Sequence, residues 1–419
     1  MRITIEDYIE QNRISKYLPD DYSEKLLCYM NTYNRIKDTV KINYDYPELF
    51  CCYTLNKTCE IVTLNEEKSY LIYDMALGQY MSYLNTFINM EDLTQDHLEW
   101  FYSRCRAEIF CSMGQFEAAI LAKMMTDTIK ECCPGDISKC NNTLPVVNAM
   151  SYVQECFVML HEISHYRLSK ISHEEYKQQI QSMRAWIHKE DLEILDRRST
   201  EINKEFWENG ASDIVKDIYN YSSFKSDFDN HIILEHDYYS KDSNIEEIIC
   251  DRYALSILIN YMESFLPFIN EIYGYELDKR EYYFLVCYAC QVALENLAIL
   301  EMIDNSCASV ISNGYEIEIF KAKKLNDPFS SSLSRKRCLI HSMIQLLDLK
   351  DSTFSDGLPM LTNCFDDTCL ILWEHLFNPS ISKKVKEEYN IKVNAFEICN
   401  DNNVILILKG ECLARVRGW

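Results

Sequence analysis

The spacing of hydrophobic and polar positions predicts both strands and a helix in the N-terminal part of the chain. Residues 59–64 and 69–73 are short runs rich in β-branched and apolar side chains, and a polar turn at 65–68 separates them. Such runs are typical of β-strands. Asp74 then begins a helical pattern of apolar positions that continues to Phe87. We therefore expect two short strands followed directly by a helix.

Helical periodicity dominates most of the remaining chain. The sequence holds only 9 Gly and 8 Pro, and the run 146–209 contains neither. A shortage of these two helix breakers favours helices joined by short connections. We expect helices at about 146–168, 245–261 and 331–347, and two more between 261 and 302.

The changes in pattern along the chain also suggest its organisation. Residues 391–398 and 404–408 look like a β-hairpin at the end of the chain. The segment 170–245 is long and charged, which suggests helices and loops inserted into a larger domain.

We therefore expect an N-terminal helical segment at 1–45, a main domain at 46–350 with a charged helical insertion at about 170–245, and a small C-terminal α/β module at 351–419. The predicted fold class is mainly α with a small β-sheet (α+β).

Composition and charge narrow the classes of partner. Hydrophobic residues make up 47% of the chain and charged residues 26%, as in ordinary globular proteins. The formal net charge of −23 would repel phosphate backbones and anionic lipid headgroups. The most apolar stretch, 282–303, contains Glu295 and Glu301, so we expect a buried helix there. The sequence thus predicts no nucleic-acid partner and no membrane association.

The 19 cysteines bear on the redox compartment. Their number is odd, the N-terminus lacks the apolar run of a signal peptide, and most of them lie in hydrophobic segments. Reduced cysteine behaves as a small buried hydrophobe, so we expect a cytoplasmic protein without structural disulfides. Cys287 and Cys290 have metal-site spacing, but there is no second pair at a matching distance, and we expect them to be core residues.

One segment carries the pattern of a catalytic metal site. His161, Glu162 and His165 form an HExxH sequence within the helix expected at 146–168. Residues four apart lie on one face of a helix, so the two imidazoles can bind one ion while Glu162 lies beside them as a base. The simpler alternative is a pair of histidines on an ordinary helix.

A catalytic zinc site needs a third protein ligand. Glu247 and Asp251 are again four residues apart, on a helix that is otherwise apolar. We expect Glu247 to bind the metal and Asp251 to accept a hydrogen bond from a ligand imidazole. Glu246 is the alternative ligand if the helix phase differs by one residue. An acid-rich first helical turn explains Glu246 and Glu247 equally well, but it explains Asp251 less well.

The remaining histidines are weaker candidates for ligands. His231 and His236 are five residues apart, which places them on different faces of a helix. His173 and His188 lie in charged segments. We expect these four side chains to be solvated.

Here the chain resembles a known class of enzymes. HExxH followed at a distance by ExxxD is the pattern of gluzincin metallopeptidases. The segment from Glu247 to Ala254 is similar to the E-x-x-A-D-x-x-A helix of the HtpX-like and CaaX prenyl peptidases, the ImmA/IrrE group and the Lit-like phage-exclusion peptidases. The sequence Asn326-Asp-Pro328 followed by Arg335 also resembles an HtpX-like segment, although Asp327 stands where that family has His.

The resemblance implies a zincin-like catalytic core with helical additions and assigns roles to matching residues. The family's ligands match His161, His165 and Glu247, its base matches Glu162, and its supporting acid matches Asp251. Without membrane spans or a recognisable DNA-binding segment, the chain looks most like the soluble Lit-like group. Members of that group cleave a host protein to abort phage infection.

The expected function is therefore a Zn²⁺-dependent endopeptidase that cleaves a cytoplasmic protein, with a role in antiviral defence implied by the resemblance alone. The donor for the oxyanion stays open among Tyr166, Tyr253, Arg335 and His341. Residues 69–73 are either a sheet edge that accepts a substrate strand or an interior strand.

Three alternatives stay beside this expectation. One is a non-catalytic protein-interaction module on a zincin fold. Another is a protease gated by an activating or inhibiting protein partner. The third is a regulator-cleaving protease like those of the ImmA group.

Overall fold

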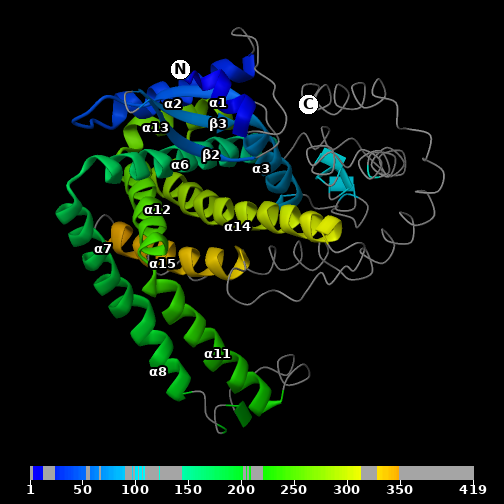
Figure 1. Ribbon diagram of the computed structural model, residues 1–419, viewed down its shortest axis with the longest axis vertical. Coiled ribbons are helices and arrows are strands. Elements are labelled where there is room, and N and C mark those ends of the chain that lie inside the picture. Colours follow the sequence, from blue (N-terminus) through cyan, green and yellow to red (C-terminus); the bar gives the residue numbers. More distant parts are fainter. Residues whose placement is uncertain are drawn as a thin grey trace.

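The structure is a computed structural model, shown in Figure 1. It describes residues 3–12, 24–52, 57–65, 68–89, 144–201, 220–312 and 328–348, with scattered positions at 97–122 and 204–208. The described part is mainly α-helical with a small β-sheet, as the sequence predicts. The C-terminal module and the hairpin expected at 391–408 lie outside the described residues.

A three-stranded sheet forms one layer of the body. The strands are β1 (Glu48–Cys52), β2 (Cys59–Leu64) and β3 (Lys68–Asp74), in the order β1-β3-β2. β3 pairs in parallel with β1 and antiparallel with β2. Both strands expected from the sequence are therefore present. Because β3 is the central strand, residues 69–73 are interior, and among the described strands β2 and β1 form the edges.

Strand β1 was not predicted from the sequence. It is a five-residue run without clear alternation of polar and apolar side chains, and so short a run carries little periodicity. Its pairing with β3 joins residues 22 positions apart, such as Glu48 and Tyr70. Long-range pairing of this kind decides that the segment is a strand.

Three helices adjoin the sheet at the N-terminal end of the chain. α1 (Ile5–Asn12) and α2 (Glu24–Thr39) lie in the segment 1–45 that was expected to be helical. α3 (Met75–Ile88) begins directly after β3, where Asp74 caps it by accepting a hydrogen bond from the backbone N–H of Ala76 at 3.1 Å. An aspartate at this position satisfies a helix N–H that has no partner within the helix.

The central element of the body is α6 (Leu144–Lys170). It packs against the sheet strands β2 and β3 and against α2, α3, α12, α13 and α14, and in Figure 1 it passes between the sheet and α14. Its apolar side chains, such as Val153, Phe157 and Leu160, are buried in the main core. Burial on several sides fixes the axis of the helix that carries His161 and His165.

Four further helices complete the body: α12 (Asp242–Asn260), α13 (Met262–Tyr273), α14 (Lys279–Ser312) and α15 (Pro328–Asp348). The stretch Lys279–Glu301 of α14 is long and apolar enough to cross a membrane, but 83% of its most apolar window is buried within the protein. The buried Glu295 on this helix pairs with Lys336 of α15 at 3.2 Å. Among the described helices α14 is thus the one candidate span, and it packs as a core helix.

The charged insertion forms an extension that we call the arm. It consists of α7 (His173–Ile187), the π-helical turn η2 (His188–Leu192), α8 (Glu193–Glu201) and α11 (Tyr221–Ser240). The helical run from α7 to α8 leaves the body, and α11 returns beside it (Figure 1). A small hydrophobic cluster, separate from the main core, joins the arm to the first turns of α12.

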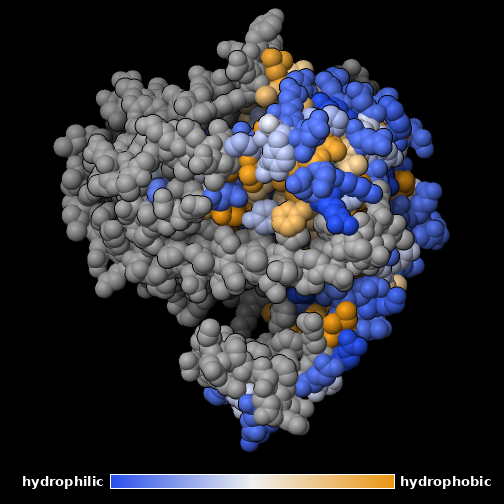
Figure 2. All heavy atoms as spheres, turned by 180° about the vertical axis from the view of Figure 1, so that it is seen from behind, coloured by the Kyte–Doolittle hydropathy of each residue, from blue (hydrophilic) through white to orange (hydrophobic). Residues whose placement is uncertain are grey.

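The described surface is mainly hydrophilic, and the described cysteines are reduced. Hydrophilic side chains predominate on the coloured outer surface in Figure 2, and small groups of apolar side chains show between them. None of the ten cysteines whose side chains the structure describes forms a disulfide. Cys287 and Cys290 are buried in the main core, as expected, where they pack as apolar side chains.

Candidate metal centre

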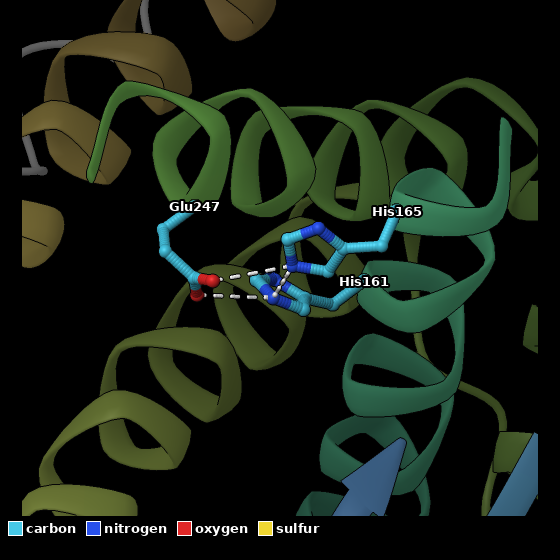
Figure 3. Close-up of side chains that lie close together, drawn as sticks. All are labelled: His161, His165 and Glu247. Atoms are coloured by element: carbon cyan, nitrogen blue, oxygen red, sulfur yellow. Dashed lines mark hydrogen bonds and ion pairs between the residues drawn. The ribbon is translucent and has the colours of Figure 1, made fainter. Parts of the chain in front are cut away.

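Three side chains from two helices meet in one place. His161 and His165 project from adjacent turns of α6, and Glu247 projects from α12 toward them (Figure 3). The Nε2 atoms of the two imidazoles are 3.1 Å apart. Glu247 Oε2 lies 3.3 Å from Nε2 of His161, and Glu247 Oε1 lies 3.3 Å from Nε2 of His165. Among the described residues, these three form the only group able to hold a metal ion.

The spacing of these donor atoms suits a tetrahedral ion. Ligand atoms about 2.0 Å from a tetrahedral zinc are separated from one another by about 3.3 Å. The three separations in the site, 3.1, 3.3 and 3.3 Å, lie at or near this value. Two imidazoles and one carboxylate are also the donor set of catalytic zinc sites, which keep a fourth position open. The residues present therefore fit a zinc ion.

Both imidazoles are oriented by a carboxylate on the ring nitrogen that faces away from the centre. His161 Nδ1 lies 2.8 Å from Asp251 Oδ1, and His165 Nδ1 lies 2.8 Å from Glu246 Oε1. A carboxylate accepts the Nδ1 proton, which leaves the lone pair of Nε2 free for a metal. Asp251 thus makes the hydrogen bond expected for it, whereas Glu246, the alternative ligand, makes the equivalent contact with His165.

Arg335 of α15 supports the carboxylates on α12. Its guanidinium donates two hydrogen bonds to Asp251, at 2.7 and 2.8 Å, and its Nη1 lies 3.1 Å from Glu247 Oε2. A guanidinium presents donors in a fixed fork, so it can fix the orientation of both acids at once. Arg335 was a candidate oxyanion donor, but the structure engages it with these two carboxylates.

The carboxylates around the two imidazoles favour positive charge on the imidazole rings. Burial lowers the pKa of His161, but hydrogen bonds to Asp251 and Glu247 outweigh burial and raise this pKa to about 10. Burial raises the pKa of Glu247, but hydrogen bonds with both histidines and the charge of Arg335 bring it well below its usual range. Carboxylates that stay charged in a largely buried site need a compensating cation, which a divalent metal would supply.

Glu162 follows His161 on α6, and the charges of all three candidate ligands act on its carboxyl group. Burial raises the pKa of its carboxyl group, while the charges of His161 and His165 oppose that rise. The negative charges of Glu247 and of Glu60 on β2 also raise the pKa of the Glu162 carboxyl group. The charges of the three candidate ligands and of the edge strand β2 therefore all act on the Glu162 carboxyl group.

The other candidate oxyanion donors make contacts through the hydroxyl of Tyr166, the ring of Tyr253 and the ring of His341. The hydroxyl of Tyr166 donates to the backbone carbonyl of Asp45 at 3.0 Å. The guanidinium of Arg167 on α6 lies over the ring of Tyr253, with its central carbon 4.3 Å from the ring centroid. His341 Nε2 is 3.8 Å from Asp191 Oδ1, at the base of the arm. None of these contacts directs a donor toward the ligand group.

The histidines set aside from the sequence lie outside the centre. His173 and His188 are exposed, as is His236, whose Nε2 lies 3.1 Å from Asp196. The expectation that these three are solvated is confirmed. The side chain of His231 lies outside the described residues.

Sequence reasoning missed one residue of the site. The hydroxyl of Tyr176, on α7 of the arm, donates to Glu246 Oε2 at 2.7 Å. Tyr176 follows two glutamates in a charged segment, and no spacing relates it to the HExxH helix. Only the packing of α7 against α12 brings the two residues together.

A groove of about 460 Å³ lies between α7 and α12. Its walls include Trp186 and Arg252, whose guanidinium carbon is 4.5 Å from the indole ring centroid. None of the three ligand side chains lines this groove. The metal centre and the groove therefore occupy different faces of α12.

Comparison of the chain with family models, with curated proteins and with solved structures finds no match. The function is therefore inferred from the geometry and chemistry of the site.

Proposed function

We propose that this protein is a zinc-dependent metallopeptidase in which His161, His165 and Glu247 bind the metal and Glu162 is the catalytic base. The observation that carries the proposal is the triangle of donor atoms with separations of 3.1 to 3.3 Å. A structural zinc site would normally have four protein ligands and no use for an additional carboxylate. Here three ligands are accompanied by Glu162.

The chemistry follows from the positions of the side chains. A bound Zn²⁺ would supply a Lewis acid that activates water and polarises a peptide carbonyl. Glu162 would accept a proton from the attacking water and return it to the leaving amine. Asp251 and Glu246 would hold the two imidazoles in the required tautomer. No described side chain is assigned to the oxyanion.

The position of β2 supports a peptide as the substrate. β2 is an edge strand among those described, and it packs against the helix α6 that carries the catalytic motif. An extended peptide can add to the edge of a sheet as a further strand. Glu60 on β2 is close enough to Glu162 for its charge to act on it. A peptide paired with β2 would therefore pass beside the catalytic base.

The biological setting remains part of the proposal. Through its resemblance to the Lit-like group, the chain would act on a cytoplasmic protein in defence against phage. The arm and the C-terminal module would then serve recognition or gating by a protein partner. A fold of the same kind could also bind partners without catalysis, and the experiment below separates these functions.

The test combines metal analysis with one substitution. We expect one zinc per purified chain, and we expect Glu162→Gln to keep the fold and the zinc. Glutamine has the size and helix propensity of glutamate but cannot act as the base. Cleavage of denatured casein and of a proteome-derived peptide library should fall by several orders of magnitude, measured by mass spectrometry of new termini.

Two results would overturn the proposal. Purified protein that binds no zinc in an equilibrium titration would exclude the metal centre. Zinc-loaded protein whose cleavage is equally fast with and without the Glu162 carboxyl group would exclude the proposed mechanism.

A further inference from the structure

A chain of hydrogen bonds links the arm to a metal ligand. The Tyr176 hydroxyl on α7 donates to Glu246 Oε2 at 2.7 Å, and Glu246 Oε1 lies 2.8 Å from Nδ1 of His165. Each oxygen of one carboxylate therefore has a different partner. Of the two imidazoles, His165 is the more exposed, with 24% of its side chain accessible, whereas 9% of the His161 side chain is accessible.

The two orienting carboxylates are held in different ways. Asp251 is buried, with 2% of its side chain accessible, and the guanidinium of Arg335 donates a hydrogen bond to each of its carboxylate oxygens. Glu246 has 25% of its side chain accessible and one more rotatable bond than aspartate. A carboxylate that is partly in water rotates unless a second contact restrains it. The Tyr176 hydroxyl is the contact that fills this role for Glu246.

The local structure of α7 holds Tyr176 at a fixed position. Ser172 and Glu175 form a reciprocal capping box at the start of the helix, directly beside Tyr176. Such a box satisfies two backbone N–H groups at the start of a helix and so stabilises its first turn. Further along α7, Arg184 donates to Asp242 Oδ1 at 2.6 Å and to the backbone carbonyl of Ser240 at 3.1 Å. These contacts join α7 to the start of α12 and bring Tyr176 to Glu246.

We propose that Tyr176 is a positioning residue that acts on the metal ligand His165 through Glu246, so that the docking of α7 on α12 and the affinity for the metal are coupled. The inference rests on the proposed metal centre. Coupling of this kind is reciprocal. An α7 that stays docked raises the affinity for the metal, and a bound metal stabilises the docked α7. A partner that lifted the arm would thereby weaken metal binding.

The first test is a double-mutant cycle on zinc affinity, which is independent of peptidase activity. Tyr176→Phe removes the hydroxyl and keeps the ring, which packs in the arm cluster. Loss of groups that orient a ligand typically weakens metal affinity about 10- to 100-fold. We expect that range for Glu246→Ala and about three- to tenfold for Tyr176→Phe. In the Glu246→Ala background, Tyr176→Phe should have no further effect, because its route to His165 is gone.

The measurements are equilibrium titrations of the metal-free full-length protein with Zn²⁺ against a competing chelator. Tyr275→Phe is the matched control, because Tyr275 is an exposed tyrosine outside the arm, and it should leave the affinity unchanged. An unchanged zinc affinity in Tyr176→Phe would overturn the proposal. So would a Tyr176→Phe substitution that lowers the zinc affinity equally in the wild-type protein and in the Glu246→Ala variant. If the wild-type protein bound zinc without cleaving peptides, the proposed function would be overturned. The double-mutant cycle would still test the coupling, because it measures zinc affinity alone.

The second test measures the effect of metal binding on the docking of α7. Backbone amide hydrogen exchange in α7 should slow when Zn²⁺ is added to the wild-type protein, because the metal stabilises the docked helix. The same addition should slow exchange much less in Tyr176→Phe, although exchange around His161 should slow in both proteins. Equal slowing of α7 in the two proteins would contradict the proposed route.

Discussion

Four acidic side chains surround the two imidazoles of the site, and helix phase and tertiary packing give each a different task. Glu247 faces the ligand nitrogens, and Asp251, one turn later on α12, reaches the far side of His161. Glu246 precedes Glu247 by one residue and reaches the far side of His165. Glu162 follows His161 on α6 and faces the charges of the ligand group. In the proposed metal centre, identical functional groups thus serve as ligand, orienting acid and base through their positions on two helices.

At the residue scale, Asp251→Ala should weaken zinc binding about 10- to 100-fold without affecting the base Glu162. The reason is that His161 loses the acceptor for its Nδ1 proton, and Arg335 loses its bidentate partner. The loss is measured by chelator competition on refolded protein. Asp251→Asn is the control, because its amide oxygen can still accept the imidazole proton, and it should lose less affinity. Equal affinities for all three proteins would remove Asp251 from the metal centre.

At the element scale, the close approach of α3 to its neighbours depends on a residue without a side chain. A Cβ atom on Gly78 would lie 2.8 Å from the hydroxyl of Tyr29, 2.9 Å from that of Tyr73 and 3.1 Å from Glu155 Oε1. Such separations are shorter than normal contacts. The Tyr73 side chain is fully buried, and its hydroxyl has no hydrogen-bond partner among the described residues. Gly78 therefore lets α3, α2 and α6 meet.

Gly78→Ala should lower the free energy of unfolding by about 1–2 kcal/mol, because overpacking outweighs the higher helix propensity of alanine. Urea denaturation followed by circular dichroism measures the change. Tyr73→Phe removes the most constrained of the three oxygens and should recover much of the loss in the double variant. A single Gly78→Ala variant more stable than wild type would show that α3 has room at this position.

The base of the arm is held to α15 by a buried ionic cluster. Asp191, in the π-helical turn η2, accepts hydrogen bonds from Arg337 of α15 at 3.1 Å and from Tyr239 of α11 at 2.8 Å. His341 on α15 and Glu235 on α11 also face this cluster. Burial opposes the charged form of Asp191, but its hydrogen bonds and the charge of Arg337 lower its pKa to about 2.

The depressed pKa of Asp191 gives the stability a defined pH dependence. A carboxyl group whose pKa is lower in the folded state stabilises the fold above its unfolded pKa and loses that effect as the pH falls toward its folded pKa. The shift from 3.8 to about 2 corresponds to about 2 kcal/mol at neutral pH. The difference in unfolding free energy between wild type and Asp191→Asn should shrink by about 1 kcal/mol between pH 6 and pH 3.

This prediction is checked by urea unfolding of both proteins at several pH values. Comparing the two proteins at each pH cancels the contribution of acids elsewhere in the chain. A difference that stays constant over this range, or grows toward acid, would show that Asp191 is not ionised against Arg337 in the folded protein.

At the scale of the whole molecule, most of the described cysteines are buried, as apolar side chains are. Eight of the ten described cysteines are buried, and none of the ten forms a disulfide. Burial raises the pKa of thiols such as Cys51 and Cys287 to about 12, which keeps them protonated and unreactive at neutral pH.

Thiol titration of freshly purified, denatured protein should therefore find nearly all 19 cysteines reduced. The native protein should react with far fewer, because buried thiols are inaccessible. Several protected pairs in denatured protein that was never exposed to oxidant would contradict the proposal of a reducing compartment.

The sequence by itself determined the features that depend on neighbours along the chain. The spacing of His161 and His165 placed two imidazoles on one face of a helix, because helical geometry is local. The same argument placed Asp251 one turn from Glu247 on α12. Apolar periodicity and the scarcity of Gly and Pro predicted the main helices of the body and two of the three described strands, although α14 continues to Ser312, beyond the end expected near residue 302.

Only the tertiary structure decided which of these elements meet and which residues act together. The Tyr176–Glu246 and Arg335–Asp251 hydrogen bonds join residues 70 and 84 positions apart, and the sheet places β3 between β1 and β2. No local pattern carries such information, because these contacts arise when separate helices pack their apolar faces together. The three side chains of the candidate metal centre and the contact of Asp251 with an imidazole could therefore be predicted from the sequence, whereas the contacts of Tyr176, Glu246 and Arg335 required the fold.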